Sequence, residues 1–166
     1  QEAISFNQSL NSWVPNSAQN MSNMFKEAVN FNGTIGAWTT SAVTNMEAMF
    51  YGATAFDQPI GSWNVSLVSN MREMFRDASN FNQDLGNWDV SNVTNMENMF
   101  NGSGLSTYNY DQIIKSFATQ ENIASNISFG AHNMRYCLSE EDRELLIQEK
   151  GWTINGDFKD CETEPF

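Results

Sequence analysis

The sequence predicts an α/β repeat solenoid, a leucine-rich-repeat-like right-handed coil of four 25-residue repeats with a C-terminal α+β cap. Two observations carry this prediction. Phenylalanine and tryptophan recur every 25 residues without a slip, and eight of the nine methionines fall in the same register. The columns are Phe6/Phe31/Phe56/Phe81, Trp13/Trp38/Trp63/Trp88, Leu10/Ile35/Ile60/Leu85, and the Asn-Met and Met-Phe pairs that begin at Asn20 and Met24. A unit this short cannot bury its own apolar face, but stacked copies build a continuous core.

Each repeat is expected to contain one short strand and one short helix. The Asn- and Gly-rich segment before Trp88 disfavours a helix and predicts a short parallel strand near 85–88, which would form the concave face. A helical stripe and a capping box predict a short outer helix over 95–101 and its equivalents. The stripe is Val93, Met96, Met99 and Phe100, and the box is Thr94 with Glu97.

One asparagine column, formed by Asn20, Asn45, Asn70 and Asn95, precedes the methionines. The amide group can donate and accept, so a buried asparagine stack could satisfy backbone groups of successive rungs at the turn of the coil. Ligand binding by this column is the alternative.

The unit from Phe81 to Phe100, with its Trp88, Asn95-Met96 and Met99-Phe100 landmarks, resembles the bacterial surface-protein repeat of lipoprotein-associated and BspA-like leucine-rich proteins. The resemblance covers residues 3–103. It implies a secreted or cell-surface solenoid used in adhesion or interaction, with no catalytic residues to carry over. The first copy departs from the pattern at Val14-Pro15-Asn16 and is interpreted as a frayed end or a cut through a longer array.

The sequence period ends at Ser103, which divides the chain into a repeat solenoid (1–103) and a cap (104–166). Such atypical segments close repeat arrays. The predicted elements of the cap are a helix capped by Ser106 and running to Gln120, a strand at 127–129, a helix from the Ser139/Asp142 capping box to Lys150 that stops at Gly151, and a strand at 152–154. The final residues, 162–166, are interpreted as the start of a linker.

Cys137 and Cys161 are the two cysteines of the chain. They are too few for a zinc site and do not form a Cys-x-x-Cys pair, so a disulfide is the simplest interpretation, with two free buried thiols as the alternative. A disulfide would stabilise the fold by about 3 kcal/mol. It would also indicate an oxidising compartment outside the cytoplasm.

Composition and charge exclude several classes of protein. The chain is 40% hydrophobic, only 17% charged and has short apolar runs, which opposes both disorder and membrane insertion. A net charge of -12 opposes binding to nucleic acid or to an anionic bilayer. Gln1-Glu2-Ala3 lacks an initiator methionine and a signal-peptide pattern, so we expect a mature or excised segment located outside the cell or on its surface.

No residue pattern predicts an enzyme or a cofactor. His132 is the single histidine, and no serine lies in a G-x-S-x-G turn. Methionine pairs such as Met46/Met49 could ligate Cu(I), and Asp57, Asp84 and Asp89 could ligate Ca²⁺, but core packing and solvated turns are favoured, so no metal is predicted. Seven Asn-x-Ser/Thr sequons begin at Asn7, Asn20, Asn32, Asn64, Asn92, Asn101 and Asn126.

The predicted function is a non-enzymatic interaction or adhesion module that binds a protein or glycan through the solenoid face. Gln58, Gln83, Asn64 and Asp89 are the candidate contact residues, because they flank the inward Ile and Trp columns with alternating polarity. One alternative is a carbohydrate-binding accessory module with an exposed tryptophan row. The other is a purely structural spacer within a larger surface protein.

Overall fold

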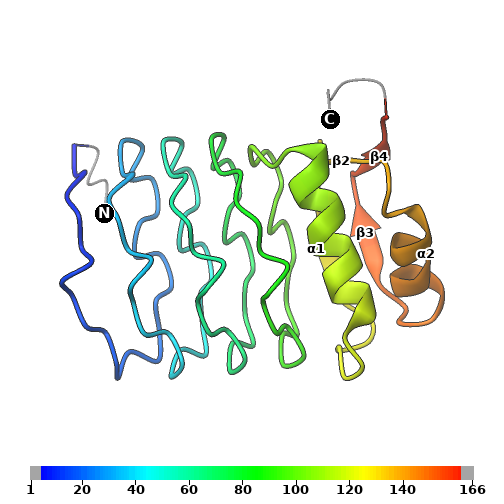
Figure 1. Ribbon diagram of the computed structural model, residues 1–166, viewed down its shortest axis with the longest axis horizontal. Coiled ribbons are helices and arrows are strands. Elements are labelled where there is room, and N and C mark those ends of the chain that lie inside the picture. Colours follow the sequence, from blue (N-terminus) through cyan, green and yellow to red (C-terminus); the bar gives the residue numbers. More distant parts are fainter. Residues whose placement is uncertain (1–4, 162–166) are drawn as a thin grey trace.

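Successive 25-residue segments lie side by side as flattened coils along the first two thirds of the chain (Figure 1). The computed structural model describes residues 5–161. We name the segments coil 1 (5–29), coil 2 (30–54), coil 3 (55–79) and coil 4 (80–104). The expected linker at 162–166 and the start of the chain at 1–4 lie outside the described residues.

One side of each coil pairs its backbone with the next coil. In coil 1, the N–H groups of alternate residues donate to carbonyls of coil 2. Met21 donates to the carbonyl of Asn45 and Phe25 to that of Met49, both at 2.9 Å. Of the N–H groups between these donors, that of Ser22 donates to the side chain of Asn20, and those of Met24 and Lys26 donate three residues back within the coil, which forms consecutive turns. The same pattern joins coil 2 to coil 3 and coil 3 to coil 4. We call this side the backbone ladder; its rungs are residues 20–27, 45–52, 70–77 and 95–102.

The expected outer helix at 95–101 is wrong, because this segment is a rung of the backbone ladder. Asn98 has φ 57°, a left-handed conformation that an α-helix of L-residues does not accommodate. The expected capping box is also absent. The Thr94 hydroxyl donates to the carbonyl of Ser69 in the preceding coil, and the Glu97 N–H donates to the side chain of Asn95.

The expected strand near 85–88 is likewise not formed. The Trp88 N–H donates to the carbonyl of Leu85 at 3.0 Å, so this segment is a tight turn. Backbone pairing between coils therefore lies on the side for which the helix was expected. The sequence carried a signal for a turn-rich backbone on this side. Gly52 and Gly102 occupy the same position of the repeat, and in the structure both have the positive φ that glycine adopts readily.

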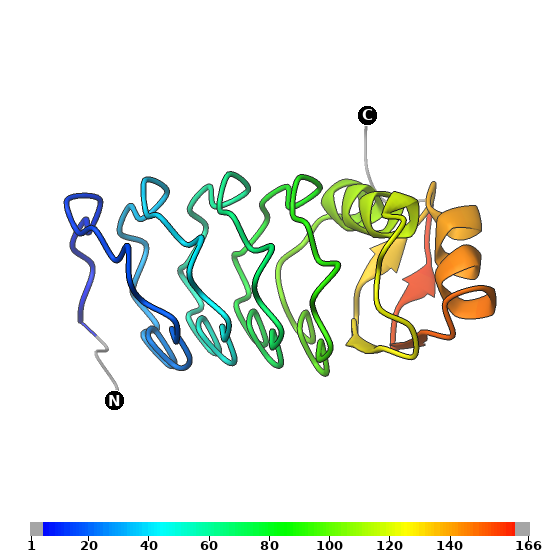
Figure 2. The same ribbon diagram turned by 90° about the horizontal axis from the view of Figure 1, so that it is seen from below.

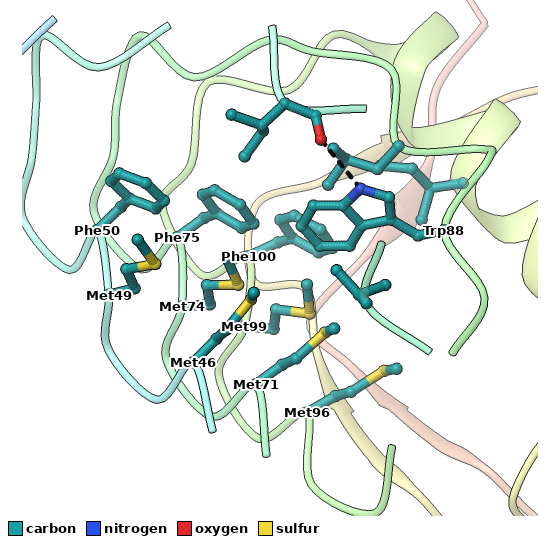
Figure 3. Packing of buried hydrophobic residues seen from close by; sticks show 14 of the residues in the cluster. Met46, Met49, Phe50, Met71, Met74, Phe75, Trp88, Met96, Met99 and Phe100 are labelled. Carbon is teal, nitrogen blue, oxygen red and sulfur yellow. Dashed lines mark hydrogen bonds between the residues drawn. The ribbon is translucent and has the colours of Figure 1, made fainter. Parts of the chain in front are cut away.

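The core is built from the periodic columns. The rings of Phe50, Phe75 and Phe100 stack 5.6 Å apart, and Phe75 also stacks on Phe81 at 4.0 Å. Two rows of methionines run beside them (Figure 3), and all six in coils 2–4 are fully buried: Met46, Met49, Met71, Met74, Met96 and Met99. The predicted core packing of these six methionines is confirmed by their burial.

The C-terminal region contains two helices and two small parallel sheets. The helices are α1 (Thr107–Thr119) and α2 (Glu140–Gln148), and the strands are β1 (Ser128–Gly130), β2 (Arg135–Tyr136), β3 (Thr153–Asn155) and β4 (Phe158–Lys159). β1 pairs with β3, and β2 pairs with β4. Both predicted helices and both predicted strands are present, the strands displaced by one residue. The two-residue strands β2 and β4 were not predicted.

The sequence period ends at Ser103, but the backbone pairing does not. The Phe100 N–H of coil 4 donates to the carbonyl of Gly130, and the Ala131 N–H donates onward to Asn155, both at 2.9 Å. The Trp152 indole donates to a carbonyl 28 residues earlier, which is the separation found for Trp38, Trp63 and Trp88. The cap therefore continues the stack with two irregular coils that carry α1 and α2 as insertions.

Asp111 of α1 and a disulfide hold the cap together. The Asp111 carboxylate accepts the N–H groups of Cys137, Leu138 and Ser139. Cys137 is joined to Cys161, so the alternative of two free thiols is wrong. The Ser139 hydroxyl donates to Asp111 at 2.6 Å and does not cap α2, which corrects the predicted capping box. Neither helix in residues 5–161 has the length and apolarity needed to cross a membrane.

A buried tyrosine makes the stability of the cap sensitive to alkaline pH. Tyr110 donates to Asp157, which is paired with Arg143 and has no exposed side-chain surface. Burial, reinforced by the Asp157 charge, raises the pKa of Tyr110 well above its ordinary value. Its contribution to stability is therefore complete below the unfolded-state pKa of about 10 and is lost as the pH rises beyond that value.

We expect the free energy of unfolding of the protein to fall more steeply above about pH 10 than that of the Tyr110→Phe variant, which has no hydroxyl to ionise. Urea unfolding curves recorded across this pH range measure the difference. Tyr108→Phe, at an exposed position on the same helix, is the matched control and should follow the parent protein. Equal pH slopes for the parent protein and Tyr110→Phe would contradict the prediction.

Candidate functional site

The asparagine column has a local structural role. The side-chain oxygens of Asn20, Asn45, Asn70 and Asn95 each accept the N–H two residues further along the same coil, at 2.8 to 3.1 Å. These Asx turns shape the start of each rung of the backbone ladder. The expectation of a buried stack between rungs is wrong, because the side chains are half-buried or exposed.

A second asparagine column, missed in the sequence, links the coils directly. The side-chain oxygen of Asn32 accepts the N–H of Asp57, and that of Asp57 accepts the N–H of Asn82, both at 2.9 Å. We call the column Asn7, Asn32, Asp57 and Asn82 the Asx ladder. It ends at α1, because Asn82 accepts the N–H of Ser106. The available signal was the Asn or Asp that follows every column phenylalanine.

Two of the four predicted contact residues belong to the Asx ladder. Gln58 donates to the side chain of Asn32 at 2.9 Å, and Gln83 donates to that of Asp57 at 2.6 Å. Both side chains are half-buried and bridge neighbouring coils. Their amide groups are therefore engaged within the protein.

Asn64 and Asp89, the other two predicted contact residues, share one exposed column. Each accepts the N–H two residues ahead, Ser66 and Ser91 respectively, at 3.0 Å. A tight turn separates this column from the Asx ladder within each coil. The structure therefore places the four predicted residues in two separate rows.

Asp89 lies in a hollow of about 470 Å³ between coil 4 and the C-terminal end of α1. The Gln120 side chain clamps the two sides together, because it accepts the N–H of Val90 and donates to the carbonyl of Trp88. The Ser116 hydroxyl adds a bond to the carbonyl of Gly86. We call this the Asp89 hollow; its lining is Gly86, Asn87, Trp88, Asp89, Ser91, Ser116, Thr119, Gln120, Glu121 and Asn122.

The lining of the Asp89 hollow offers amides, hydroxyls and two carboxylates. Asp89 and Glu121 make it negative, and its lining contains no lysine, arginine or histidine. Trp88 is fully buried and presents no ring face for stacking. The arrangement favours hydrogen bonds and ion pairs with a cationic group. The residues that α1 and its C-terminal end contribute to the lining stand about thirty positions after the residues that coil 4 contributes, so their approach was not visible in the sequence pattern.

The three aspartates weighed as possible Ca²⁺ ligands do not form a cluster. Asp57 is part of the Asx ladder, and Asp84 and Asp89 each accept an N–H of their own coil. Within residues 5–161, no group of three or more His, Cys, Asp and Glu side chains is arranged to hold a metal ion.

All basic residues of the four coils lie on the backbone ladder. Arg72 pairs with Glu47, Glu73 and Glu97 at 3.0 to 3.4 Å. Lys26 and Arg76 lie over the ring of Tyr51. The cations of the coils are thus engaged on one side, and the sides that carry Asn64, Asp89 and the Asx ladder have none.

The sequence matches the family model described as "Mycoplasma protein of unknown function, DUF285" over residues 1–113 and again over 30–136. Together the two ranges cover the four coils and the cap as far as β2. Searches of curated proteins and of solved structures returned no match. The matched ranges span well over half of the chain, so the protein belongs to this Mycoplasma family of unknown function, DUF285.

Proposed function

We propose that the protein is a non-enzymatic interaction module, used in adhesion at a bacterial cell surface or in secreted form, that binds a protein partner through the Asp89 hollow. In this proposal the coils form a leucine-rich-repeat-like right-handed solenoid related to BspA-like surface proteins. The observation that carries the proposal is the hollow itself, a concave polar site with two carboxylates and no cation.

Charge supports a partner that presents lysine or arginine side chains. The chain carries a net charge of -12, and the side of the coils beside the hollow holds no basic residue. Complementary charge of this kind accelerates encounter and selects partners. We therefore expect binding that weakens as salt is added.

The chemistry of the hollow supports binding rather than catalysis. Its carboxylates have no histidine or thiol beside them, and Asp89 already accepts the N–H of Ser91. The disulfide between Cys137 and Cys161 supports a location outside the cytoplasm, where such bonds persist. The carbohydrate alternative has less support, because Trp38, Trp63 and Trp88 are buried and cannot form an exposed row.

The test uses charge-removing substitutions that keep local structure. Asp89→Asn retains the Asx turn, since Asn64 makes the same turn in the same column of coil 3. We expect Asp89→Asn combined with Glu121→Gln to weaken binding by about tenfold or more, because two charge-assisted contacts are lost. The loss of affinity is measured by binding of the full chain to immobilised extracellular matrix proteins and to glycans at two salt concentrations.

Asp84→Asn is the matched control. Asp84 makes the same kind of turn, to Gly86, but it does not line the hollow. It removes one charge from the same coil and should leave binding unchanged. Binding that survives Asp89→Asn/Glu121→Gln undiminished, or that is confined to glycans without cationic groups, would refute the proposal.

A further inference from the structure

The two ends of the coil stack differ. At the C-terminal end, α2 lies beyond the strands of the cap and forms the end of the molecule (Figure 2). At the other end, coil 1 exposes side chains whose equivalents are buried in the next coil. Trp13 is 59% exposed against 4% for Trp38, and Met24 is 43% exposed against 0% for Met49.

Coil 1 also presents a row of open backbone acceptors. In coil 2, the carbonyls of Asn45, Glu47, Met49 and Tyr51 accept N–H groups from the preceding coil. The equivalent carbonyls of coil 1 are those of Asn20, Ser22, Met24 and Lys26, and no N–H of residues 5–161 donates to them. This edge is the continuation of an interface that the protein already forms three times between its coils.

The Trp13 indole indicates the same missing neighbour. Trp38, Trp63 and Trp88 each donate their Nε1–H to a carbonyl of the preceding coil, 28 residues earlier. For Trp13, the corresponding carbonyl would belong to a coil stacked against the outer face of coil 1. The indole, the carbonyl row and the exposed Met24 therefore require one and the same kind of occupant.

We propose that the outer face of coil 1 is a docking surface for a further coil of the same 25-residue repeat. Such a coil supplies N–H donors at alternate residues to the four carbonyls, a carbonyl to Trp13 and an apolar surface to Met24 and Phe6. The coil 1 of a second copy of this protein does not fit this face, because its outer edge also presents carbonyl groups and the two rows of acceptors would oppose each other. The surface is distinct from the Asp89 hollow, so the two proposals stand or fall separately.

The test is to supply that coil in register. A copy of residues 30–54 is fused directly ahead of Ser5 in place of residues 1–4, so that the 25-residue spacing is kept. The copy carries Trp38→Phe, which leaves Trp13 as the tryptophan that reports on the face. We expect loss of the acrylamide-accessible tryptophan emission seen in the parent protein, down to the level of the Trp13→Phe variant, together with a higher thermal midpoint.

The matched control is the same fusion with Met46→Ser and Phe50→Ser in the copy, which removes the apolar surface and should leave Trp13 as accessible as in the parent. Hydrogen exchange gives a second readout, since the copied Met46, Ala48, Phe50 and Gly52 amides should become protected when they donate to coil 1. If acrylamide quenches Trp13 in the intact fusion as strongly as in the parent protein, the proposal is overturned. Self-association of the parent protein that protects Trp13 also overturns it, because the occupant would then be a second copy.

Discussion

Replacing Phe75 by alanine is expected to lower the free energy of unfolding by about 3 to 5 kcal/mol, the range for a fully buried aromatic residue. Phe75 of coil 3 stacks on rings of both neighbouring coils. Its centroid lies 5.6 Å from those of Phe50 and Phe100, and 4.0 Å from that of Phe81. The cavity would therefore open at the centre of the stack, where relaxation is limited by the bonded rungs on both sides. Urea unfolding followed by tryptophan emission measures the loss.

Phe158→Ala is the control for this substitution. Phe158 is 45% exposed and lies at the edge of the cap, so its removal should cost about 1 kcal/mol or less. Each coil contacts only its neighbours, so Phe75→Ala should also weaken the coupling between the coils on either side. A loss at Phe75 no greater than that at Phe158 would show that the aromatic stack does not hold the coils together.

Replacing Asp111 by alanine is expected to lower the free energy of unfolding by about 3 kcal/mol, because several hydrogen-bond donors lose their acceptor at once. The carboxylate accepts the N–H groups of Cys137, Leu138 and Ser139 as well as the Ser139 hydroxyl. These bonds fix the segment between β2 and α2 to α1. We expect α2 to lose hydrogen-exchange protection before the coils do, which amide exchange followed by mass spectrometry can resolve.

Lys115→Ala is the control, since Lys115 lies one turn along α1 and is exposed. It should change the unfolding free energy by less than about 0.5 kcal/mol. Reducing the disulfide in the parent protein tests the neighbouring constraint separately. If Asp111→Ala leaves α2 as protected as in the parent, the carboxylate does not anchor the cap.

The buried set of residues could be predicted from the sequence, but the path of the backbone could not. In coils 2–4, the columns that contain Phe56, Ile60 and Met71 are buried as their period indicates. The helix predicted for 95–101 failed because the apolar spacing of Val93, Met96 and Met99 is compatible with a turn-rich rung as well as with a helix. Periodicity reports which side chains face the core, and it does not distinguish two backbone paths that present the same side chains.

The candidate site was predicted in part. Asp89 lies in the hollow, and Asn64 lies in the same exposed column, but Gln58 and Gln83 are engaged between coils. Alternation of polarity marked all four as outward-facing, yet it carries no information on whether an outward amide meets solvent or the next coil. Gln120 and Glu121, directly after the end of α1, completed the site from outside the repeat pattern.

The sequence by itself determined the 25-residue period, the apolar columns that form the core, and the positions of the cap helices. The period and the columns depend on contacts repeated at constant spacing, and α1 depends on an apolar stripe and on the Ser106 cap. Only the tertiary structure decided which side of the coil carries the backbone ladder. That choice depends on left-handed residues such as Ala48 and Glu73, and on N–H donors whose acceptors lie 24 residues away. The tertiary structure likewise decided that the backbone pairing continues past Ser103. Hydrogen bonds such as that from Phe100 to Gly130 join backbone groups, so they do not require the repeated side chains that define the sequence period.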